Sequence, residues 1–142
     1  TRRPEPVSGG TGQQGQQGQQ GQGVVPPGWP AQVPPPGTPG WERRASGWLF
    51  DLCPADLRAH EVLRRQPVVL AYLAERHVAA ALLATTEAVA TLRADLRDVV
   101  EPEALAESLD AMQREQARLQ AAARSVRLVA EALRGVRFRA RL

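Results

Sequence analysis

The chain has 142 residues, enough for one domain of common size, and its formal net charge is only +3. It contains a single cysteine, Cys53, which excludes an intramolecular disulfide and any multi-cysteine metal site. There is no secretory signal pattern and no uninterrupted apolar run of the ~20 residues that a membrane-spanning helix needs. We therefore expect a cytoplasmic protein with no transmembrane segment.

Residues 1–40 differ in composition from the rest of the chain. They hold ten of the twelve glycines and nine of the twelve prolines, and Gln-Gly units fill the stretch from Gly12 to Gly23. Such a stretch has too little apolar surface to offset the entropy of ordering it. We expect a disordered, low-complexity arm over 1–40, polyproline-like from Pro26 to Pro39, followed by a single domain over 41–142.

Two short amphipathic helices are predicted between residues 41 and 65. Three of the six aromatic residues lie between Trp41 and Phe50, and a second apolar pattern runs from Pro54 to Arg65, with Asp56 in its first turn. Large aromatic side chains bury much apolar area. We expect these helices to cover part of a longer helical structure.

Two long helices are predicted over 67–99 and 102–134. Pro67 and Pro102 suit the first helical position, and Arg134 followed by Gly135 suits a helix end. Apolar side chains recur at alternating steps of four and three, which is typical of coiled-coil-like packing. Because the connection is so short, the helices should be reversed neighbours. The predicted fold is all-α: a long antiparallel helical hairpin with one or two short helices packed on it.

The apolar stripes form a seam that we predict as the interaction surface, since four elements of this size make a thin core. The predicted partner is a second copy of the chain or another helical protein. Thr85 and Gln116 interrupt the stripes, and two interpretations fit: they set register and oligomeric state, or they lie at a wet edge. The predicted seam residues are Val78, Leu82, Val89, Leu92, Leu96, Leu109, Met112, Gln116, Leu119 and Val126.

Positive charge concentrates at the C-terminus. All eighteen basic residues are arginine, and residues 124–142 carry a net charge of +5 while the remaining residues sum to −2. The basic tail 135–142 alternates apolar and cationic side chains, so it could bind the phosphates of a nucleic acid or an anionic surface. Alternatively, it lays Val136, Phe138 and Leu142 on the hairpin. The predicted anion-binding residues are Arg134, Arg137, Arg139 and Arg141.

Catalytic and metal-binding patterns are weak. Cys53 as a nucleophile would need a base, for which His60 is the nearest histidine in sequence. His60 and His77 could bind a metal only with carboxylates brought in by folding. There is no phosphate-binding loop, dinucleotide fingerprint or nucleophile elbow. We predict no catalytic, cofactor-binding or metal-binding residue.

Four stretches, Gly40–Arg44, Trp48–Arg58, Val62–Pro67 and Arg76–Val78, carry a resemblance to a known group. Over residues 41 to about 135 the chain resembles short hypothetical proteins of high-GC actinobacteria. The resemblance implies a bacterial cytoplasmic setting, and it transfers no catalytic residue.

The sequence thus predicts a non-enzymatic helical module for protein–protein interaction or self-association. The first alternative is a weak nucleic-acid or anionic-surface binder that uses the arginine-rich tail. The second alternative is an enzyme that uses Cys53.

Overall fold

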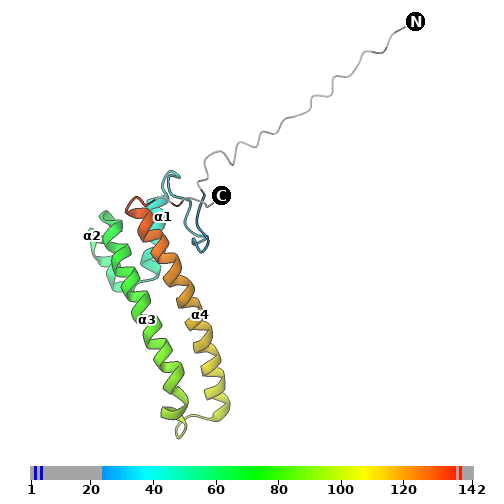
Figure 1. Ribbon diagram of the computed structural model, residues 1–142, viewed down its shortest axis with the longest axis vertical. Helices are drawn as coiled ribbons and strands as arrows, with labels where there is room; N and C mark the ends of the chain where they lie inside the picture. Colours follow the sequence, from blue (N-terminus) through cyan, green and yellow to red (C-terminus); the bar gives the residue numbers. More distant parts are fainter. Residues whose placement is uncertain (1, 3, 5–23, 137, 139–142) are drawn as a thin grey trace.

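The computed structural model describes residues 2, 4, 24–136 and 138. Within these residues the structure is helical and contains no strand, which confirms the all-α prediction. Figure 1 shows two long helices side by side, with shorter elements gathered at one end. The elements are α1 (Trp41–Asp51), the 3₁₀ helix η1 (Ala55–Ala59), α2 (Glu61–Arg65), α3 (Pro67–Leu96) and α4 (Pro102–Leu133).

The bounds of α3 and α4 follow from local chemistry. Each begins with a proline at its first position, where the missing N–H would have no partner within the helix. α4 ends at Leu133, and Gly135 just beyond its C-cap Arg134 has a φ of +88°, a left-handed conformation. The Val136 N–H donates to the Glu131 carbonyl and the Gly135 N–H to the Ala132 carbonyl, as in a Schellman motif. The predicted ends differ from the observed ones by three residues in α3 and one in α4.

α3 and α4 make the most extensive contact in the molecule. In Figure 1 the chain follows α3 away from the short elements, turns through residues 97–101 and returns along α4. The short elements α1, η1 and α2, here called the lid, lie at the end where α3 begins and α4 finishes. Within the described part of the chain, the short elements cover only that end of the helix pair on a third side.

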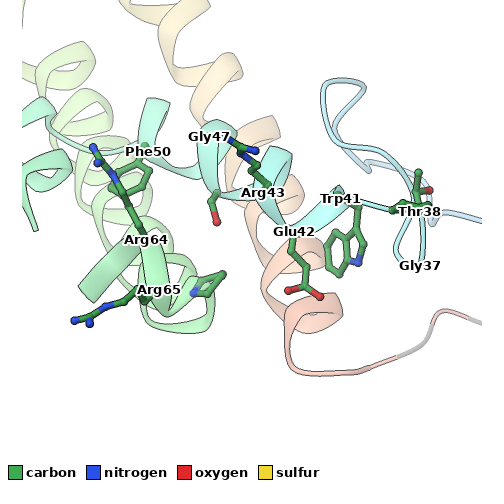
Figure 2. A pocket seen from close by; sticks show the side chains of 13 residues that line it. Gly37, Thr38, Trp41, Glu42, Arg43, Gly47, Phe50, Arg64 and Arg65 are labelled. Atoms are coloured by element: carbon green, nitrogen blue, oxygen red, sulfur yellow. The ribbon is translucent and has the colours of Figure 1, made fainter. Parts of the chain in front are cut away.

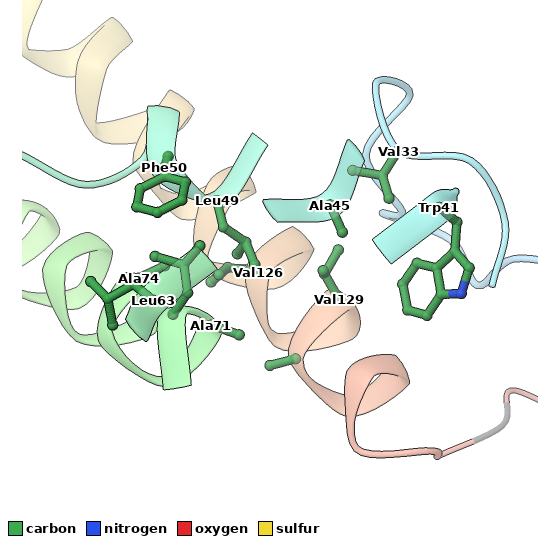
Figure 3. Packing of buried hydrophobic residues seen from close by; sticks show 12 residues of the cluster. Val33, Trp41, Ala45, Leu49, Phe50, Leu63, Ala71, Ala74, Val126 and Val129 are labelled. Atoms are coloured by element: carbon green, nitrogen blue, oxygen red, sulfur yellow. The ribbon is translucent and has the colours of Figure 1, made fainter. Parts of the chain in front are cut away.

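The core therefore sits under the lid (Figure 3). Leu49 of α1 is fully buried, as are Leu70 of α3 and Val129 of α4, so all three helices meet there. At about 25 cal/mol per Å² of apolar surface, such side chains stabilise the fold by roughly 1.5–3 kcal/mol each. The buried cluster consists of Val33, Trp41, Ala45, Leu49, Phe50, Leu63, Leu70, Ala71, Ala74, Val126, Val129 and Ala130.

The second predicted short helix, from Pro54 to Arg65, is divided into η1 and α2. His60 between them is extended, with φ −93° and ψ 102°. On one continuous helix, Leu57 and Leu63 would lie about 120° apart, because six residues turn through about 600°. The break at His60 lets Leu63 become buried while Leu57 packs against the same cluster.

The predicted disordered arm requires correction for residues 24–40, which pack onto the helices. Val33 is only 2% exposed and belongs to the core, and Figure 3 places it beside Ala45. Trp29 packs against the cluster with its ring centre 6.4 Å from that of Trp41. Of the remaining arm, residues 1, 3 and 5–23 lie outside the described residues.

Proline and glycine order this segment through turns. Pro27-Gly28 and Pro36-Gly37 occupy the centres of two turns, and both glycines have φ above +90°. Proline followed by a positive-φ glycine is the pattern of a type II turn. These turns fold the segment back, so that the Ser125 hydroxyl of α4 donates to the Gly28 carbonyl over 2.7 Å. Residues 24–40, whose composition is typical of linkers, thus form a series of compact turns, here called the strap.

Candidate functional site

The seam lies between α3 and α4, where most of the ten predicted interaction residues are covered. Val78, Leu119 and Val126 are buried, and Leu96 is exposed at 38%. The buried members pack within the monomer and are not free for a partner. The half-buried members, mostly away from the lid, are Leu82, Val89, Leu92, Leu109, Met112 and Gln116.

The polar interruptions of the seam, Thr85 and Gln116, are both half-buried. The Gln116 amide nitrogen donates to the Thr86 hydroxyl over 3.0 Å, which joins the two helices. Thr85 instead donates to the Ala81 carbonyl of its own helix over 2.8 Å. Gln116 is half-buried and Thr86 is exposed, so water competes for their hydrogen bond. Such a bond contributes little net stability.

Replacing Gln116 with leucine is therefore expected to raise the free energy of unfolding by about 1 kcal/mol, since apolar contact across the seam outweighs a solvated hydrogen bond. Thermal denaturation followed by circular dichroism measures the change. Replacing Gln113, an exposed glutamine on the same helix, is the matched control. An unchanged melting temperature for Gln116→Leu would contradict burial at the seam.

A second surface, the outer face of α3, lies opposite the seam. Its largest apolar side chain, Leu83, is 71% exposed, and Val69 and Tyr72 are each 44% exposed. Helical spacing of three and four residues places these side chains along one line. The outer face consists of Val69, Tyr72, Arg76, Ala80, Leu83, Glu87, Ala90 and Ala94, all of them exposed.

α3 is thus apolar on both sides, and by length and composition it could cross a membrane. Its most apolar 18-residue window has a mean hydropathy of 1.4, and 22% of that window is buried. The sequence analysis expected no transmembrane segment, because it considered only uninterrupted apolar runs. α3 passes the length and composition criteria although polar residues interrupt it. Length and composition alone do not place α3 in a membrane, because the core helix of a soluble protein passes the same two criteria.

A hollow of about 930 Å³ lies between the strap and the lid. Arg43, Arg64 and Arg65 line it together with Glu42, so it has an excess of positive charge. Arg64 is held by the Arg58 carbonyl at 2.9 Å and lies 5.9 Å from the centre of the Phe50 ring. Figure 2 shows that the three arginines extend in different directions rather than toward one point. The three arginines thus form a positively charged edge of the hollow, here called the basic rim. They do not point together at one place where an anion could bind.

A second hollow of about 730 Å³ lies where the strap meets the end of α4. Trp29 and Pro26 line one side, and Leu128, Val136 and Phe138 line the other. Phe138 is 42% exposed, so part of its ring is covered. This arrangement fits the interpretation in which the tail lays apolar side chains on the helices.

The predicted anion-binding residues are placed only in part. Arg134 is exposed at the C-cap of α4. Arg137, Arg139 and Arg141 lie outside the described residues, as does Leu142. Of the predicted set, only Arg134 belongs to the described residues.

The lid carries Cys53 and His60, and His77 lies on α3. Cys53 is half-buried, and burial raises the pKa of its thiol, with the nearby Arg58 charge as a smaller opposing effect. A raised pKa leaves less thiolate at neutral pH and makes a poorer nucleophile. His60 is exposed and His77 half-buried. Among the described residues, no three His, Cys, Asp or Glu side chains gather where they could hold a metal ion.

Sequence reasoning missed the outer face of α3 and the basic rim. The signal for the outer face was present, because Val69, Tyr72 and Leu83 fall outside the stripe yet are apolar. No comparable signal marked the rim, whose arginines come from two helices. Comparison with protein-family models, curated proteins and solved structures finds no match to this chain.

Proposed function

We propose that this protein is a non-enzymatic helical interaction module that associates with itself through its long helices. The observation that carries the proposal is that α3 is apolar on both sides, while among the described residues α4 and the lid cover only one of them. A helix that is apolar all round is normally buried on all sides, in a larger core or in a membrane.

The half-covered seam adds support. In a four-helix bundle each helix packs against two neighbours, whereas in a pair it packs against one. Away from the lid, Leu82, Val89 and Met112 remain half-buried. We propose that α3 and α4 form an antiparallel, coiled-coil-like hairpin in which α3 keeps a second apolar face for a partner helix.

The raised pKa of the Cys53 thiol makes it a poorer nucleophile, which favours a non-enzymatic role over an enzyme that uses Cys53. An anionic-surface binder that uses the C-terminal arginines is the second hypothesis. Salt dependence separates the two, because phosphate binding weakens steeply with salt and apolar helix packing does not.

The test is the mass of the full chain in solution, measured by light scattering after size exclusion from low to high micromolar concentration. We expect a species of twice the 15.4 kDa chain mass, which dissociates on dilution and persists at raised salt. A strict monomer throughout this range would overturn the proposal.

A further inference from the structure

We propose that two copies associate through the outer faces of α3, packed antiparallel about a two-fold axis, with Arg76 of each copy paired to Glu87 of the other. This inference rests on the proposed self-association and names its interface. The partner is a second copy of this chain.

Charge on the outer face is self-complementary. Between Val69 and Ala94, Arg76 and Glu87 are its only charged residues. Neither belongs to the two ion pairs found among the described residues, which join Arg58 to Asp51 and Arg118 to Glu115. When two copies pack antiparallel about a two-fold axis, Arg76 of each copy can lie against the partner's Glu87. The symmetry then makes two identical ion pairs.

Arg76 is already positioned on this face. Its guanidinium carbon lies 3.4 Å from the centre of the Tyr72 ring, and one terminal nitrogen donates to the Tyr72 carbonyl over 3.3 Å. A guanidinium has five N–H donors, so donors remain for a carboxylate. Because the Arg76 side chain is already held in place before association, less conformational entropy is lost when it forms the ion pair.

The same register matches side-chain sizes. When Arg76 faces the partner's Glu87, Leu83 faces the partner's Ala80, and Val69 faces the partner's Ala94. A large side chain against a small one lets two helices approach closely. The register also lays the two 30-residue helices, each about 45 Å long, along their full length against each other. One alignment thus satisfies charge, size and overlap together.

The two charges also favour a second copy over lipid. Arg76 and Glu87 lie inside the apolar face rather than at its ends, and charged side chains are costly within a bilayer. Against a second copy both become paired.

The test uses charge reversal in the full chain, followed by sedimentation velocity. Arg76→Glu puts a carboxylate against the partner's Glu87, and Glu87→Arg puts two guanidiniums together, so each variant alone should dissociate at least about tenfold more readily. An equimolar mixture of the two variants restores both ion pairs and should associate as the wild type does. The double variant Arg76→Glu/Glu87→Arg should do the same.

Arg114→Glu, an exposed reversal on α4, is the matched control and should leave association unchanged. Circular dichroism establishes that each variant is folded. If the wild type is dimeric but the single reversals associate equally well, or if mixing restores nothing, this interface is wrong while self-association stands. A monomeric wild type that floats with lipid vesicles overturns both and assigns the outer face to a membrane.

Discussion

Replacing Leu49 with alanine is expected to lower the free energy of unfolding by about 3 kcal/mol, within the range of large-to-small core substitutions. Leu49 is 0% exposed and lies where α1 meets both long helices, so truncation leaves a cavity that three packed elements cannot close. Urea denaturation followed by circular dichroism measures the loss.

Val99→Ala is the control for this substitution, because Val99 is 76% exposed in the α3–α4 connection. Its effect should stay within about 0.5 kcal/mol, as for most surface positions. Equal stabilities for the two variants would show that the lid does not pack on the long helices as described.

Replacing Leu83 with glutamate is expected to weaken self-association at least a hundredfold. The side chain is 71% exposed in the monomer, so the monomer should keep its fold and stability. In the proposed assembly the same position is covered, and an unpaired buried carboxylate costs several kcal/mol. Sedimentation equilibrium measures the dissociation constant.

The matched control is Val99→Glu, which places the same charge at an equally exposed apolar position away from the outer face. It should leave the dissociation constant unchanged. Loss of association in both variants would point to a general effect of charge and remove the special role of Leu83.

The long helices were predictable because strong local signals mark their ends. Pro67, Pro102 and Gly135 each have a conformational preference that acts without tertiary contacts. The side of each helix that becomes buried was predictable as well, since regular spacing brings Val78 and Leu82 to one line.

The strap could not be predicted from composition. Val33 and Trp29 are isolated apolar residues among prolines and glycines, so they produce no periodic pattern. Their burial depends on turns at Gly28 and Gly37, and on a surface that exists only once α1 and α4 have packed. Composition measures the average apolar content of a segment, and here two well-placed side chains decide its structure.

The outer face of α3 was overlooked for a different reason. Tracing one stripe through Val78 and Val89 accounts for a single partner helix and leaves the other apolar positions uncounted. Counting apolar residues around the whole circumference would have identified Val69 and Leu83 as in need of cover. The basic rim needs the folded lid, because Arg43 and Arg64 come from helices whose relative placement local sequence does not determine.

The strap also bears on the spacing of equivalent positions in an assembly. Val24 and Val136 line the same hollow, so both lie at the pole where the strap meets the end of α4. Reversed pairing of two copies along α3 would set those poles apart by roughly the 45 Å length of the helix. Fluorophores attached at position 24 or 136 of the two copies would then be held that far from each other.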